Sequence, residues 1–161
     1  MKRSQAGFTL IELIIVIVIL GILAVTAAPK FLNFGSDANR SVLSGVRGSL
    51  ESAGSLVYGK SIIAGVQGTA AADTEVEGIP VTFGYPKATS AALSAAAELS
   101  DFVFGVAVAE VIAAGAVTTP GSIRIGATAA ATTDDGNCYL LYTASGTAGS
   151  KPVITIEDSG C

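Results

Sequence analysis

Residues 8–28 read FTLIELIIVIVILGILAVTAA, and this stretch decides the architecture of the chain. It holds 17 hydrophobic residues out of 21 and one charged residue, Glu12. A helix of this length rises about 31 Å, which matches the thickness of a bilayer hydrocarbon core, about 30 Å. The stretch therefore predicts a helix that can span a membrane.

Charges at the start of this helix suggest its orientation and its role. Lys2 and Arg3 precede the apolar stretch, so the positive-inside rule keeps the N-terminus in the cytoplasm and sends the chain after Pro29 outward. Glu12 lies one turn into the helix, where an unpaired carboxylate costs at least ~2.5 kcal/mol. Either this side chain reaches the interface or stays neutral, or it awaits a positive partner on another chain. Cleavage just before Phe8 would create such a partner, a free amino group.

The overall composition narrows the function classes. The 161 residues carry 13 acidic and 9 basic side chains, a net charge of −4, which argues against binding of nucleic acid by this chain alone. Histidine is absent, which removes the commonest general base and most zinc or copper sites. We expect no enzyme, no cofactor and no metal site.

The residues around the start of the apolar stretch carry a family resemblance. Gly7-Phe8-Thr9-Leu10-Ile11-Glu12, after a short basic leader, resembles the class III leader and N-terminus of type IV prepilins. The resemblance implies that residues 1–7 are a leader that a prepilin peptidase cuts off after Gly7. It also implies that the same enzyme N-methylates Phe8 and that Glu12 is the family's assembly glutamate.

Two further stretches, 21–33 and 83–88, are similar to the mannose-sensitive haemagglutinin (MSHA) type of pilin. The resemblance implies a major structural subunit that polymerises with other pilin subunits into a surface filament for adhesion to host or abiotic surfaces and for biofilm formation. It also implies a precursor in the inner membrane, where the pilus assembly machinery acts on it, and then an extracellular pilus.

Two alternatives remain open at this point. A pseudopilin of type II secretion would share the leader and Glu12 but would build a short periplasmic piston, and that relative usually lacks a disulfide. An ordinary signal peptide cut after Val25-Thr26-Ala27 would release a soluble periplasmic domain.

The helical pattern continues beyond the membrane segment 8–28. Apolar residues recur three or four apart from Phe34 to Val57, which predicts a helix to about Gly59, with that glycine as its C-cap. The amphipathic half would pack onto a globular head within residues 29–161. Gly21 and Pro29 weaken the helix, and in the family's filaments the matching stretch can lose its helical form. The resemblance therefore implies flexibility there.

Short runs rich in β-branched and aromatic residues predict strands in the rest of the chain. A sheet of three or four antiparallel strands with one long helix is an α+β architecture. It is also the type IV pilin fold that the resemblance implies. The predicted strands are 79–83, 122–125, 139–143 and 153–156; residues 88–99 predict a short helix, and residues 102–114 fit either helix or strand.

The two cysteines, Cys138 and Cys161, fit a disulfide better than a four-ligand metal site, and two free thiols are the alternative. A bond between them would close a loop of 24 residues, worth about 3 kcal/mol in the chain-entropy model. The resemblance implies the same pairing, because the family carries a disulfide-bounded region near its C-terminus.

Four other motifs have simpler interpretations. Residues 54–61 match the pattern of a phosphate-binding P-loop, but they follow a helix instead of a strand. Asp134-Asp135-Gly136-Asn137 is interpreted as a turn in preference to a calcium site. Asn39-Arg40-Ser41 is interpreted as a solvent-facing trio in preference to a glycosylation site, and the acidic run 73–77 as a solvated loop.

Overall fold

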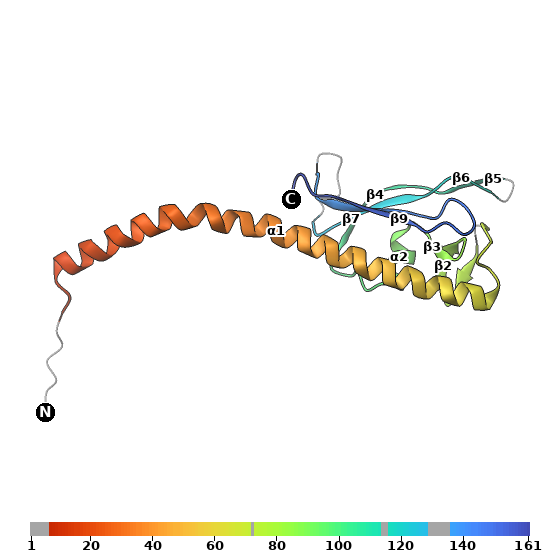
Figure 1. Ribbon diagram of the computed structural model, residues 1–161, viewed down its shortest axis with the longest axis horizontal. Coiled ribbons are helices and arrows are strands. Elements are labelled where there is room, and N and C mark those ends of the chain that lie inside the picture. The colour runs from red at the N-terminus through yellow and green to blue at the C-terminus, as the bar shows by residue number, and fades with distance from the viewer. Residues whose placement is uncertain (1–6, 72, 114–115, 129–135) are drawn as a thin grey trace, which may run out of the picture. The chain divides into compact units, whose positions relative to one another are not determined.

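The computed structural model describes residues 7–71, 73–113, 116–128 and 136–161; for residues 28–33 and Val106 it describes the backbone alone. The chain divides into two units, Met1–Ala38 and Asn39–Cys161. A single helix, α1 (Leu10–Ala64), contributes residues to both (Figure 1).

In the first unit, α1 contains the predicted membrane segment. The stretch Leu10–Ala27 has a mean hydropathy of 3.0, and none of it is buried. By its length and composition it is able to cross a membrane. The backbone is helical at Gly21 and at Pro29 as well.

The other end of α1 lies in the second unit, five residues beyond the predicted end at Gly59. Gly65 has a φ of 71°, and its N–H donates to the carbonyl of Ile62 at 3.1 Å. The N–H of Val66 donates to the carbonyl of Ser61 at 3.0 Å. These two bonds form a Schellman motif that ends the helix at Ala64. The predicted C-cap at Gly59 is wrong, because glycine inside a helix costs only about 1 kcal/mol and the next turn is held by the buried Ser61, whose hydroxyl donates to the carbonyl of Gly84.

A four-stranded antiparallel sheet, in the order β4-β7-β8-β9, lies against the second half of α1 (Figure 1). Three of the four predicted strands fall in this sheet and are confirmed. The ambiguous stretch 102–114 supplies the edge strand and the start of a separate two-stranded ribbon, β5-β6. The second strand of this ribbon, β6, was not predicted. The strands are β4 (Val103–Val108), β5 (Val111–Ala113), β6 (Ala116–Thr119), β7 (Ser122–Gly126), β8 (Tyr139–Thr143) and β9 (Val153–Glu157).

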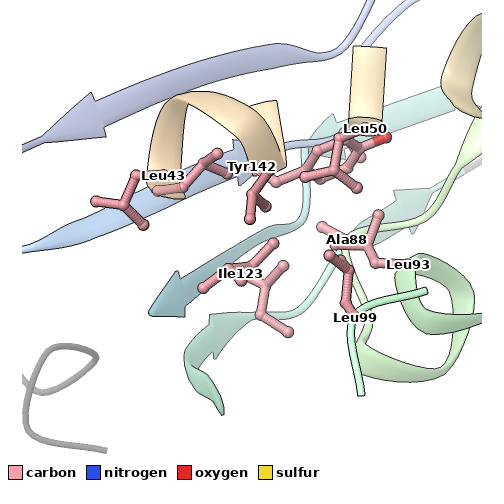
Figure 2. Close-up of a cluster of buried hydrophobic side chains, with 11 residues drawn as sticks. Leu43, Leu50, Ala88, Leu93, Leu99, Ile123 and Tyr142 are labelled. Carbon is pink, nitrogen blue, oxygen red and sulfur yellow. The ribbon is translucent and has the colours of Figure 1, made fainter. Parts of the chain in front are cut away.

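The core forms where alternate side chains of the sheet meet residues three or four apart on α1. Figure 2 shows Leu43 and Leu50 of α1 together with Tyr142 of the sheet. Helix α2 (Ser90–Ala96), which falls within the predicted 88–99, closes the core through Leu93, and Thr89 caps its N-terminus. The buried hydrophobic residues of this cluster are Leu43, Val46, Leu50, Ala88, Leu93, Leu99, Ile123, Ile125, Leu140, Tyr142 and Ala144.

Three short strands form a second sheet, β1 (Glu75–Val76), β2 (Ile79–Thr82) and β3 (Tyr85–Pro86). Both of its two-residue turns, Glu77-Gly78 and Phe83-Gly84, have positive φ at both positions, as type I′ hairpin turns require. The strand predicted at 79–83 is confirmed as far as Thr82. The prediction of a loop over the acidic run 73–77 is wrong in part, because Val76 is buried and pairs with β2.

Candidate functional site

The side chain of Glu12 folds back onto the start of α1. The backbone N–H of Thr9 donates to Glu12 Oε2 at 2.8 Å, and the Thr9 hydroxyl donates to the same oxygen at 2.7 Å. In return, the N–H of Glu12 donates to Thr9 Oγ1 at 3.3 Å. This is a capping box, which satisfies N–H groups that the first turn of a helix leaves without partners. The sequence Thr-x-x-Glu predicts this motif, although our sequence analysis did not identify it.

The capping box leaves Glu12 able to bind a second donor. Every hydrogen bond that the described residues make to this carboxylate goes to Oε2. A carboxylate has about four acceptor sites, so Oε1 is available to a group from another molecule. The intramolecular bonds also offset part of the cost of placing a carboxylate at the edge of a bilayer.

The bond between Gly7 and Phe8 precedes the helix. Residues 7–9 are non-helical, nothing lies within 4 Å of a Cβ built on Gly7, and the side chain of Phe8 is 92% exposed. A protease needs an accessible backbone outside regular structure, and this bond lies in such a segment. The other residues of the predicted leader, 1–6, lie outside the described residues.

At the other end of the chain, a disulfide joins Cys138 and Cys161, with their Cα atoms 4.7 Å apart. This is the pairing that the family resemblance implied. The N–H of Gly160 donates to the carbonyl of Asn137 at 2.8 Å, and Asp158 pairs with Arg40 of α1 at 3.3 Å. The C-terminal residues are therefore tied both to the segment before β8 and to the helix.

The other motifs have structural roles where the structure describes them. Residues 54–61, the P-loop pattern, lie entirely within α1, so their amides form helical bonds and no phosphate-binding loop exists there. Asn39 and Ser41 are exposed on α1. Asp134 and Asp135 lie outside the described residues. Among the residues described, no group of three His, Cys, Asp or Glu side chains is placed to hold a metal ion.

The stretch 83–88 holds the second sheet against α1. The ring of Tyr85 stacks on Tyr58 with centroids 4.6 Å apart, and the Ser61 hydroxyl donates to the carbonyl of Gly84 at 2.9 Å. The buried hydroxyl of Tyr142 donates to the carbonyl of Pro86 at 2.7 Å. In the sequence this stretch is only a mark of resemblance, because its contacts are long-range and no local pattern predicts them.

Comparisons with known proteins agree with the geometry at the N-terminus. Residues 2–28 match the prokaryotic N-terminal methylation motif. Over 96 residues the chain is 35% identical to the fimbrial protein EcpC of Eikenella corrodens. This alignment covers 60% of this chain and 59% of EcpC. Over 34 residues it is 59% identical to the type IV major fimbrial protein FimA of Dichelobacter nodosus, covering 21% of this chain and 22% of FimA.

The chain thus spans less than two thirds of the length of either relative. No solved structure matches it. The chain is therefore similar to fimbrial proteins, including a type IV major fimbrial protein, most directly in its N-terminal part.

Proposed function

We propose that this chain is the precursor of a type IV pilin, a structural subunit that polymerises into a surface filament. The observation that carries the proposal is the junction at residues 7–12: an accessible Gly7–Phe8 bond, then a helix capped by Glu12, then an exposed apolar segment. The methylation motif over 2–28 and the fimbrial relatives support it.

The proposed sequence of events starts in the inner membrane, with the N-terminus in the cytoplasm. Prepilin peptidase cuts after Gly7 and methylates the new amino group of Phe8. The assembly machinery then moves the subunit into a filament. There, Oε1 of Glu12 accepts a hydrogen bond from the charged amine of Phe8 of a neighbouring copy. The apolar segments leave the lipid and bury their side chains against one another.

The finer part of the proposal is an MSHA-type major pilin that serves adhesion and biofilm formation. It rests on stretches 21–33 and 83–88. It also includes local loss of helix between Gly21 and Pro29 when the filament is stretched. Extending about eight residues from 1.5 to roughly 3.3 Å of rise each lengthens the segment by up to ~14 Å.

The experiment is to shear surface filaments from cells that express the chain and to identify their main component by mass spectrometry. The chain is expected as the main component, and a strain without its gene is expected to lose these filaments and to attach less to surfaces. A chain found only in short periplasmic assemblies, or only as soluble periplasmic protein, would overturn the proposal in favour of a pseudopilin or a secreted domain.

A further inference from the structure

The edge of the four-stranded sheet at β4 has no charged side chain directed into the solvent. Glu110 is the single charged residue between residues 102 and 119. Its side chain is turned inward and is only 11% exposed. The Thr82 hydroxyl donates to Glu110 Oε2 at 2.8 Å, and Lys87 Nζ lies 3.8 Å from the same oxygen. Val108 and Val111, on either side of Glu110, are 50% and 49% exposed, so apolar side chains face the water here.

The backbone of this edge is regular over five residues. Beyond an irregularity in β4, a single register holds from Ala107, which pairs with Ile123, to Val111, which pairs with Thr119. We call residues 107–111 the β4 edge. In the part of the chain that the structure describes, no strand pairs with its outer side. An exposed apolar edge is a template for a further strand, and proteins usually block it with charges, with proline or with a covering segment.

A groove with a volume of about 650 Å³ lies beside the β4 edge. Phe104, Ala107 and Ile112 line it from the strands, and Ala88 and Thr89 line it from the segment that leads into α2. These side chains are small or apolar. A further strand would place every second side chain on one face of the sheet, and the groove has room for side chains of that kind.

The opposite edge of the same sheet is β9. Its pairing with β8 is regular over all five residues, Val153–Glu157. Val153 is 58% exposed, Thr155 is exposed as well, and no described strand pairs with the outer side of β9. Four of its five residues are valine, isoleucine or threonine, which are uncharged and favour strand pairing. β9 therefore matches the β4 edge in length and in character.

The directions of the strands decide how two copies can meet. Neighbouring strands in the order β4-β7-β8-β9 are antiparallel, so the two outer strands, β4 and β9, run in opposite directions. A filament of identical subunits joins two different surfaces of copies that all point the same way. When β9 of one copy lies beside the β4 edge of the next copy, the two strands are therefore antiparallel, as they are within the sheet.

We infer that the β4 edge binds strand β9 of a second copy of this chain, so that the sheets of neighbouring subunits continue into one another. The backbone N–H and C=O groups of the two edges then bond to each other instead of to water. The side chains of the added strand cover the groove beside the β4 edge. This inference rests on the proposed function and adds to it the surface through which the globular heads contact one another.

Photo-crosslinking of sheared filaments tests this contact. A photoreactive residue in place of the exposed Thr155 of β9 is expected to give covalent dimers on a denaturing gel, attached within residues 103–113 of the other copy. The matched control is Thr147, an exposed threonine in the loop after β8, which is expected not to give this product. The inference would be overturned if Thr155 attached only to other regions or to a different protein, or if Thr147 gave the same product in equal yield.

Hydrogen exchange supplies a second readout, which needs no substitution. The amides of β4 and β9 that point away from the sheet are expected to exchange at least about tenfold more slowly in filaments than in the subunit dissolved in detergent. β7 and β8 have strands on both sides already, so their amides are expected to change little. Equal exchange of β4 and β9 in the two states would overturn the inference. If wild-type cells make no filaments of this chain, the proposed function itself fails; if filaments form without this contact, only this inference fails.

Discussion

Two glycines, Gly78 and Gly84, occupy the two hairpin turns of the second sheet, and they differ in how closely other residues pack around them. Gly84 occupies a type I′ turn with a φ of 83°, and a Cβ there would lie 2.9 Å from Tyr58 Cδ2 and 3.1 Å from Gln67 Cα. Gly78 occupies the equivalent turn with a φ of 79°, but nothing lies within 4 Å of its Cβ position. The two glycines therefore separate backbone strain from close packing.

Replacing these glycines by alanine is expected to give unequal losses of stability. Gly78→Ala is expected to lower the free energy of unfolding by about 1 kcal/mol, because alanine is strained at a positive φ. Gly84→Ala has the same strain and also forces the second sheet away from α1, so it is expected to lower the free energy of unfolding by at least about 2 kcal/mol. Thermal unfolding of the purified chain in detergent measures both values. Equal losses would show that the contact with Tyr58 and Gln67 is unimportant.

Glu12 allows the cap to be separated from the charge. Glutamine at this position of a capping box still accepts the Thr9 N–H, but it carries no charge. Glu12→Gln is therefore expected to leave the precursor in the membrane and abolish filaments, whereas Thr9→Val, which removes the capping hydroxyl, keeps them. Filament yield and membrane fractionation measure the two effects. Normal piliation of Glu12→Gln would refute pairing with the Phe8 amine.

Burial raises the pKa of the Tyr142 hydroxyl well above its usual value, and the neighbouring Tyr85 adds to the shift. The unfolded chain therefore loses this proton near pH 10 while the folded chain keeps it. The free energy of unfolding should fall above pH 10, by up to about 1.4 kcal/mol per pH unit from this group.

The control for the alkaline effect is Tyr142→Phe. This variant loses the hydrogen bond to the Pro86 carbonyl, at a cost of about 1–3 kcal/mol at neutral pH, and its stability should fall less steeply above pH 10. Chemical denaturation at pH 7 and at several values above 10 measures both slopes. Parallel curves for the two proteins would contradict the assignment to Tyr142.

At the level of elements, the sequence predicted what repeats locally and missed what depends on distant contacts. The 3.6-residue periodicity identified α1, and β-branched runs identified β2, β7, β8 and β9. Gly59 was misread as a helix end because the turn that follows it is held by a distant carbonyl, that of Gly84. β6 was missed although Val117, Thr118 and Thr119 are β-branched, because the strand has only four residues and is followed directly by Pro120 and Gly121.

The candidate site was predictable to a similar degree. Gly7, Phe8 and Glu12 follow from a short motif, and two cysteines in a chain allow one pairing. The contacts of Gly84 and Tyr85 with α1 were not predicted, because they join residues that lie far apart in the sequence.

The disulfide is expected to stabilise the C-terminal strand β9. In the chain-entropy model its loop contributes about 3 kcal/mol, so the double variant Cys138→Ser, Cys161→Ser should unfold at a clearly lower temperature. A reducing agent should lower the melting temperature of the wild type to that of the variant and leave the variant unchanged. An unchanged melting temperature in both comparisons would contradict a role of the bond in stability.

For the whole molecule, the hydrophobic excess and the acidic charge belong to different parts. The apolar segment holds 17 of the hydrophobic residues, and the leader holds two of the nine basic ones. The proposed cleavage after Gly7 would leave seven basic and 13 acidic side chains, for a net charge of −6. In the proposed function, one segment attaches the subunit to lipid and then to other copies, while its acidic head stays in water.

The mass of the N-terminal peptide of the mature protein tests the proposed function most directly. The account predicts that this peptide begins at Phe8 and carries the added mass of one methyl group on its amino nitrogen. A mature chain that begins at Ala28, or one that keeps residues 1–7, would contradict the assignment of this chain as a type IV prepilin.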